Sequence, residues 1–109
     1  MDFKVKVTKH FEKQAKPLLK KYFSLKKDLA ELIEVLRVNP EFGTSLGNSL
    51  YKIRLAIGSK GRGKSSGARV ITMFIKKDET VYLVSIYDKK DFETVRIETL
   101  LSILKEEGL

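Results

Sequence analysis

Three consecutive segments between residues 50 and 87 carry the residue patterns of β-strands, and this run limits the possible folds more than any other part of the chain. Segment 50–57 (LYKIRLAI) alternates apolar with basic or small residues, which predicts a strand that buries one face. Segment 68–77 (ARVITMFIKK) is apolar on both faces and rich in β-branched residues, as in a central strand. After a tight turn at Asp78-Glu79, segment 80–87 (TVYLVSIY) predicts the next strand. The chain is therefore expected to build a sheet from these segments.

One further strand and a first helix are predicted before this run. Phe3, Val5 and Val7 alternate with lysines, which indicates a short strand with one buried face. Thr8 can then cap a helix whose apolar residues share one side (Phe11, Ala15, Leu18, Leu19, Tyr22). Pro17 removes a backbone donor deep inside that pattern, so we expect either a kink or a late helix start.

A second helix completes a predicted helical hairpin. Ser24 is its candidate N-cap, and Asn39-Pro40 is expected to end it. The apolar residues between these limits lie on one side (Leu25, Leu29, Leu32, Ile33, Leu36). Residues 41–49 contain glycines and are expected to form a loop.

A last helix is expected after residue 88, capped by Asp88 or Asp91. Its inward residues would be Phe92, Val95, Leu100, Leu101 and Leu104. The predicted order is βααβββα. This is a single α+β domain over residues 1–109, with a four-stranded, largely antiparallel sheet, a helical hairpin and a C-terminal helix.

The charge of the chain is concentrated in one segment. Residues 50–77 hold eight of the 22 basic residues and no acidic residue, and the other 14 basic residues are matched by 14 acidic ones. The whole excess of +8 therefore lies there. A segment of this kind is typical of a surface that binds a polyanion, although a solvated basic surface remains an alternative.

Composition excludes several kinds of site. The chain has no cysteine and one histidine, His10, so neither a disulfide framework nor a His/Cys metal cluster is expected. Residues 1–10 (MDFKVKVTKH) lack the apolar core of a signal peptide, and no run reaches the roughly 20 apolar residues of a membrane span, so we expect a cytoplasmic protein with no membrane partner.

Residues 58–65 (GSKGRGKS) match the pattern of a nucleotide-binding P-loop. In a P-loop, the phosphates rest on the N-terminus of a helix that begins at the Lys-Ser pair. Here the chain continues as SGARVITMF, which predicts a strand. We therefore interpret the segment as a connection between strands and expect no nucleotide cofactor.

The ordered set of LYKIRLAI, the basic glycine-rich loop, GARVITMF and VYLVSIYDKKD resembles the RelE/ParE superfamily of toxins from type II toxin–antitoxin systems. The resemblance implies a cognate antitoxin as partner. For the RelE-like branch it also implies a metal-independent endoribonuclease that cuts messenger RNA on the ribosome, next to 16S rRNA, and inhibits translation. For the ParE-like branch it implies a non-nuclease inhibitor of DNA gyrase. An RNA-binding domain without catalysis is a third alternative.

The candidate site consists of basic residues on neighbouring strands. Lys52 and Arg54 are two positions apart and project to one face, and Arg69 on the partner strand can reach the same patch. The resemblance implies that these three residues, with Lys89 after the last strand, carry catalysis. Further candidate RNA-binding residues are Lys60, Arg62, Lys64, Lys76, Tyr87 and Lys90. The segment DFETV departs from the RelE pattern, because it lacks the tyrosine that stacks on a base, a role that Tyr87 or Phe92 is expected to take.

Overall fold

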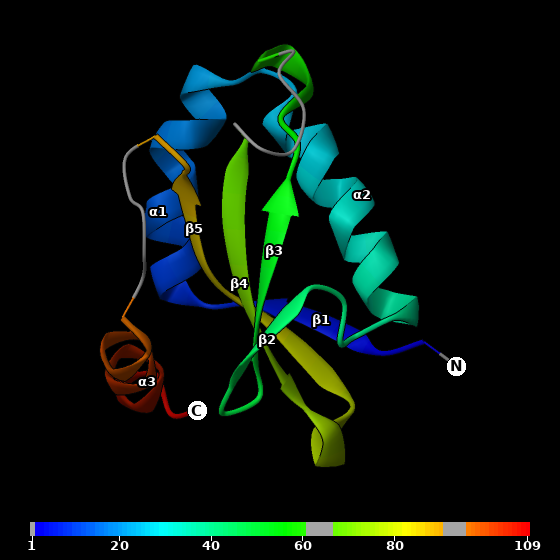
Figure 1. The fold of residues 1–109 in the computed structure, drawn as a ribbon, viewed down its shortest axis with the longest axis vertical. Coiled ribbons are helices and arrows are strands. Elements are labelled where there is room, and N and C mark those ends of the chain that lie inside the picture. Colours follow the sequence, from blue (N-terminus) through cyan, green and yellow to red (C-terminus); the bar gives the residue numbers. More distant parts are fainter. Residues whose placement is uncertain (1, 61–66, 91–95) are drawn as a thin grey trace.

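The computed structural model describes residues 2–60, 67–90 and 96–109. Figure 1 shows the arrangement of the elements. In chain order they are β1 (Lys4–Val7), α1 (Lys9–Lys21), α2 (Leu25–Val38), β2 (Thr44–Gly47), β3 (Leu50–Leu55), the 3₁₀ turn η1 (Gly58–Lys60), β4 (Ala68–Ile75), the 3₁₀ turn η3 (Lys76–Asp78), β5 (Thr80–Asp88) and α3 (Ile97–Glu106). The predicted α+β class is confirmed.

The sheet has five strands, in the order β1-β5-β4-β3-β2, so the predicted count of four is wrong. The additional strand is β2, which lies in the segment expected to be a loop and pairs antiparallel with β3. Asn48 and Ser49 connect the two strands, both with positive φ (54° and 66°), as in the tight turns of two-residue hairpins. β1 pairs parallel with β5, whereas the other neighbours are antiparallel. The sheet is therefore mixed.

The two faces of the sheet are covered by different helices. α1 and α2 pack on one face, where their residues share a cluster with Ile53, Val70 and Phe74. Leu100 and Leu104 of α3 share a second cluster with strand residues of the opposite face (Leu50, Ile71, Met73, Val84). Because neighbouring residues such as Val70 and Ile71 belong to different clusters, the alternation of the strands separates the two cores. In Figure 1, α1 and α2 join at the top and α3 lies at the lower left, beside β5.

The N-terminal helix begins where its cap predicts. Thr8 Oγ1 accepts a hydrogen bond from the Phe11 amide at 3.1 Å, and the helix starts at Lys9 and runs through Pro17 to Lys21. The expected late start is therefore wrong. The cap and the buried side chains of Phe11 and Ala15 stabilise the first two turns, which offsets the backbone hydrogen bond that Pro17 cannot make.

The second helix has the predicted limits, from Leu25 to Val38, directly before Asn39-Pro40. Ser24 occupies its N-cap position, but its hydroxyl makes no cap hydrogen bond. The hydroxyl instead donates to the Asp28 carboxylate at 2.9 Å and accepts from the Ser59 amide at 2.7 Å. Ser24 therefore joins the start of α2 to η1.

The last helix begins later than expected, at Ile97, and Arg96 precedes it. Asp88 does not cap it, because this residue ends β5 and is buried there. The candidate residues Asp91, Phe92 and Val95 lie outside the described residues. The end of α3 is attached to α1, since the carboxylate of Glu107 accepts the Lys9 and His10 amides at 2.8 and 3.1 Å.

Candidate nucleic-acid interface

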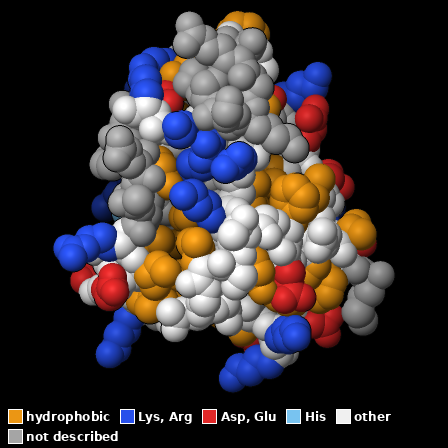
Figure 2. Space-filling model, viewed as in Figure 1, with side chains coloured by type: hydrophobic (Ala, Val, Ile, Leu, Met, Phe, Trp, Pro, Cys, Tyr) orange, Lys and Arg blue, Asp and Glu red, His pale blue; other side chains and the backbone are white. Residues whose placement is uncertain are grey.

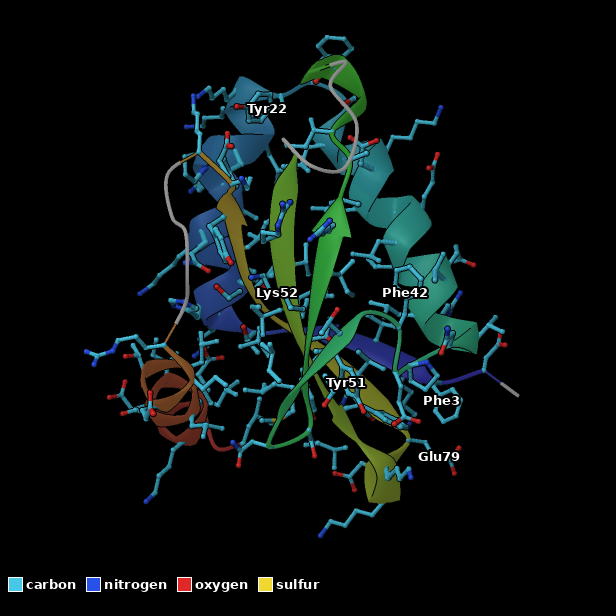
Figure 3. All side chains as sticks on the ribbon, viewed as in Figure 1. Phe3, Tyr22, Phe42, Tyr51, Lys52 and Glu79 are labelled. Carbon is cyan, nitrogen blue, oxygen red and sulfur yellow. The ribbon has the colours of Figure 1, made fainter. Side chains whose placement is uncertain are left out.

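The strand register brings the predicted basic residues together. Arg54 on β3 lies directly opposite Arg69 on β4, and Arg69 lies directly opposite Tyr87 on β5. Lys52 is two residues before Arg54 and therefore points to the same face. We call Lys52, Arg54 and Arg69 the basic patch. Figure 2 shows basic side chains gathered over the upper half of the sheet. Figure 3 labels Lys52, a residue of β3, near the middle of the view.

Cross-strand pairing places two positive charges side by side. Directly opposed residues of an antiparallel pair have Cα atoms about 4.5–5.5 Å apart, and like charges at such positions destabilise the sheet. Arg54 is exposed and Lys52 is half-buried, and neither makes an ion pair with an acidic side chain in the part of the chain that the structure describes. An anion such as a phosphate would reduce the repulsion between the two guanidinium groups.

Arg69 differs from Arg54 in its burial. Only 6% of Arg69 is exposed, and its Nη1 donates to the carbonyl of Ala68 at 3.2 Å. A guanidinium group with few rotational choices is well suited to hold a phosphate at a fixed position. Arg69 thus forms the fixed part of the basic patch and Arg54 its exposed part.

Tyr87 is the aromatic neighbour of the basic patch, but its ring is not an open stacking surface. The residue is 4% exposed. Burial raises the pKa of Tyr87, and the nearby charge of Arg69 lowers it in part. Tyr87 therefore lies beside Arg69 on the neighbouring strand as a buried residue.

The chain beyond β5 returns to the start of β4. The Lys89 amide donates to the carbonyl of Gly67 at 3.1 Å, so Lys89 lies at the Arg54–Arg69 end of the sheet. A Cβ atom on Gly67 would lie 2.0 Å from the carbonyl oxygen of Leu55. Glycine is therefore required here for the close approach of the chain to the end of β3. Lys90 is exposed, and its amide donates to Asp88 Oδ1 at 3.2 Å.

Other predicted residues lie elsewhere. Lys76 is in η3, at the opposite end of β4 and about 20 Å from Arg69 along the strand, so it does not join the basic patch. Lys60 ends η1, close in the chain to β3. Arg62 and Lys64 lie outside the described residues. β4 begins at Ala68, which confirms that a strand follows the glycine-rich loop.

One polar contact near the site was not expected from the sequence. The hydroxyl of Tyr22, at the end of α1, donates to Asp88 Oδ2 at 2.5 Å. Asp88 is the residue that pairs with Ala68, beside Arg69. The pattern DKKD indicated a helix cap, and no local signal linked Asp88 to a tyrosine 66 residues earlier. Figure 3 shows Tyr22 at the top of the molecule.

Residues 2–60, 67–90 and 96–109 contain no group of three His, Asp or Glu side chains able to hold a metal ion. None of the helices in these ranges is both long and apolar enough to cross a membrane.

The comparisons with solved structures support a RelE-like fold. No family model matches the sequence. A variant of the E. coli toxin RelE with two arginine-to-alanine substitutions, in the free state, matches with a TM-score of 0.60 and 18% identity, over 85% of this chain and 90% of that chain. A metal-bound toxin from Helicobacter pylori matches with a TM-score of 0.53 and 19% identity, over 83% and 98%. The intact E. coli RelBE toxin–antitoxin complex matches with a TM-score of 0.48 and 22% identity, over 79% and 95%. The chain therefore has a RelE-like fold, as its sequence predicted.

Proposed function

We propose that this chain is the toxin of a type II toxin–antitoxin system and that it cleaves messenger RNA without a metal ion. The observation that carries the proposal is the direct opposition of Arg54 and Arg69, with Lys52 on the same face. Two arginines at directly opposed positions can each donate to one of the two free oxygens of a phosphate. The RelE-like fold supports the same assignment.

The proposed reaction uses only groups of the RNA and of this chain. The 2′-hydroxyl of one nucleotide attacks the adjacent phosphorus while its proton passes to a base. The P–O5′ bond breaks, and the leaving 5′-oxygen receives a proton. The products are a 2′,3′-cyclic phosphate and a free 5′-hydroxyl.

Each residue of the site has a proposed role in these steps. Lys52 is the proposed base for the 2′-hydroxyl proton, because it lies on the same face of the sheet as the two arginines. Arg54 and Arg69 stabilise the charge that develops on the phosphoryl oxygens. Lys89 is the proposed proton donor to the 5′-oxygen, because its backbone lies at the same end of the sheet.

The proposed partners follow from the charge of the patch. Message bound to the ribosome in the cytoplasm would contact the basic loop residues Lys60, Arg62 and Lys64, together with Lys90 and 16S rRNA. A cognate antitoxin with acidic and apolar segments would cover the patch and keep the toxin inactive.

The test is primer extension on a message translated in a purified system, with wild type and the Lys52→Ala variant. We expect cuts within the translated region for wild type and a strong decrease for the variant. Lys76→Ala is the matched control and should cut normally, because Lys76 lies at the far end of β4. Growth arrest with DNA breaks and without message cleavage would favour a ParE-like gyrase inhibitor. Binding of RNA without either effect would favour a non-catalytic RNA-binding domain.

A further inference from the structure

The turn between α1 and α2 contains the most exposed large apolar side chain among the described residues. Phe23 is 89% exposed, and it lies between two anchored residues. The hydroxyl of Tyr22 on one side is bound by Asp88, and the hydroxyl of Ser24 on the other side is bound to Ser59 and Asp28. Phe23 is therefore held outward by a fixed backbone on both sides.

Four exposed lysines flank this aromatic ring. The sequence KKYFSLKK places Lys20 and Lys21 before it and Lys26 and Lys27 after it. Lys20 and Lys21 lie in the last turn of α1, where the helix dipole favours cations. Lys26 and Lys27 lie in the first turn of α2, where the same dipole disfavours cations. Lys26 and Lys27 therefore lower the stability of α2, which indicates that they serve a function other than folding.

The turn is also attached to the elements that lead into and out of the basic patch. The Gly58 amide donates to the Asp28 carboxylate at 3.0 Å, so α2 is bound to η1, which follows β3. Asp88 ends β5, next to the strand that carries Arg69. Figure 1 shows the α1–α2 turn beside η1 at the top of the molecule.

We infer that this turn, consisting of Phe23 with Lys20, Lys21, Lys26 and Lys27, is a second RNA-binding surface, on which an unpaired base stacks on the Phe23 ring. Aromatic side chains interleaved with cations are how proteins bind single-stranded nucleic acid: the ring takes the base and the cations take the phosphates. A lipid surface fits less well, because one aromatic ring offers little apolar area to a membrane. This surface binds RNA whether or not the basic patch cuts it.

The chain has no tryptophan, so Phe23→Trp places a single fluorescent reporter at the turn. The probe is a short 2′-O-methyl RNA oligonucleotide, which has no free 2′-hydroxyl for cleavage. We expect this unpaired strand to quench the emission at position 23, whereas the duplex of the same sequence quenches it weakly. Val38→Trp, at a position 71% exposed at the other end of α2, is the control and should not be quenched.

Two variants then separate stacking from charge. Phe23→Ala should weaken binding of the unpaired oligonucleotide by about 5- to 160-fold, the range of one base–aromatic stack. The double variant Lys26→Gln/Lys27→Gln should lower the slope of log K against log salt by about 1.4, while its melting temperature stays constant or rises. Lys4→Gln/Lys6→Gln on β1 is the matched control and should leave the affinity within twofold of wild type.

All measurements are repeated in a Lys52→Ala/Arg54→Ala background, which removes charge from the basic patch. Quenching at position 23 that persists in this background supports the second surface even if the proposed nuclease activity fails. Equal binding by Phe23→Ala and wild type would overturn the inference. Equal quenching by duplex and single strand, or quenching only by equimolar phosphatidylcholine–phosphatidylglycerol vesicles, would also overturn it.

Discussion

Tyr22 and Asp88 connect the end of α1 to the end of β5 through a hydrogen bond of 2.5 Å. Asp88, whose carboxylate accepts this bond, is 1% exposed. Because water does not reach the carboxylate, its hydrogen bonds must come from donors of the protein. This contact holds the α1–α2 turn against the end of the sheet that carries Arg54 and Arg69.

Tyr22→Phe should lower the free energy of unfolding by about 1–3 kcal/mol, because it removes a donor from a buried charged acceptor. Urea denaturation measures the change. Tyr51→Phe is the matched control, since Tyr51 donates to Glu41 at 2.7 Å in an exposed contact. It should cost less than about 1 kcal/mol. Equal losses in the two variants would contradict the role of burial.

Arg54→Ala and Arg69→Ala should differ in stability but agree in activity. Each should reduce message cleavage by about 10²- to 10³-fold, the range for the loss of one charge-stabilising donor. Arg54→Ala removes repulsion from an exposed position, so its stability should stay constant or rise by up to about 1 kcal/mol. Arg69→Ala should be less stable than wild type, because a buried side chain is lost. Primer extension and urea denaturation on the same samples separate the two effects.

Tyr87 should make stability depend on alkaline pH. Burial raises the pKa of Tyr87 in the folded state, so the folded chain holds the phenolic proton more tightly than the unfolded chain. Its contribution is complete below about pH 10 and is lost as the pH rises through the folded-state pKa. Tyr87→Phe should therefore lose less stability than wild type as the pH rises above about 10.

The Glu41 contact also raises the pKa of Tyr51, so Tyr51→Phe is measured in parallel. In Arg69→Ala, absorbance at alkaline pH should show that one tyrosine ionises at a higher pH than in wild type, because Arg69 lowers the pKa of Tyr87. An unchanged titration would show that the two side chains do not interact.

Gly67→Ala should destabilise the protein by about 1–3 kcal/mol, the cost of forcing an atom into a packed site. The new methyl group would meet the Leu55 carbonyl and separate the ends of β3 and β4, so cleavage should fall as well. Gly58→Ala is the control, because its nearest contact would be 3.5 Å, to Ser24 Oγ. Melting temperature and primer extension for both variants test this requirement.

Sequence patterns predicted the parts of the fold that depend on long periodic segments. The strands at 50–55, 68–75 and 80–88 and both helices of the hairpin were found because each has enough residues to show its period. β2 was not predicted, since Thr44–Gly47 is short and flanked by glycine, and its pairing depends on the turn at Asn48 and Ser49. The prediction that Asp88 caps the last helix was wrong, because tertiary contacts bury this residue at the end of β5.

The candidate site was only partly predictable. Alternation along β3 was enough to place Lys52 and Arg54 on one face, and antiparallel pairing brought Arg69 beside them. The burial of Tyr87 and the remoteness of Lys76 depend on register and on the length of β4, which composition does not reveal. The sequence did not indicate Phe23 as a binding residue, because helical periodicity does not show which residue of a turn is exposed to solvent.

The parallel pair of β1 with β5 determines when the sheet can be completed during synthesis. Lys4 pairs with Thr80, so the N-terminal strand has no place in the sheet until a segment made much later has emerged. Contacts this distant in sequence slow folding, because a long loop must close before they form. Arg69 is likewise unsupported until Tyr87 is present on β5. The sheet that carries the basic patch is therefore complete only after β5 has left the ribosome that makes the chain, and the proposed cleavage of message begins after that point.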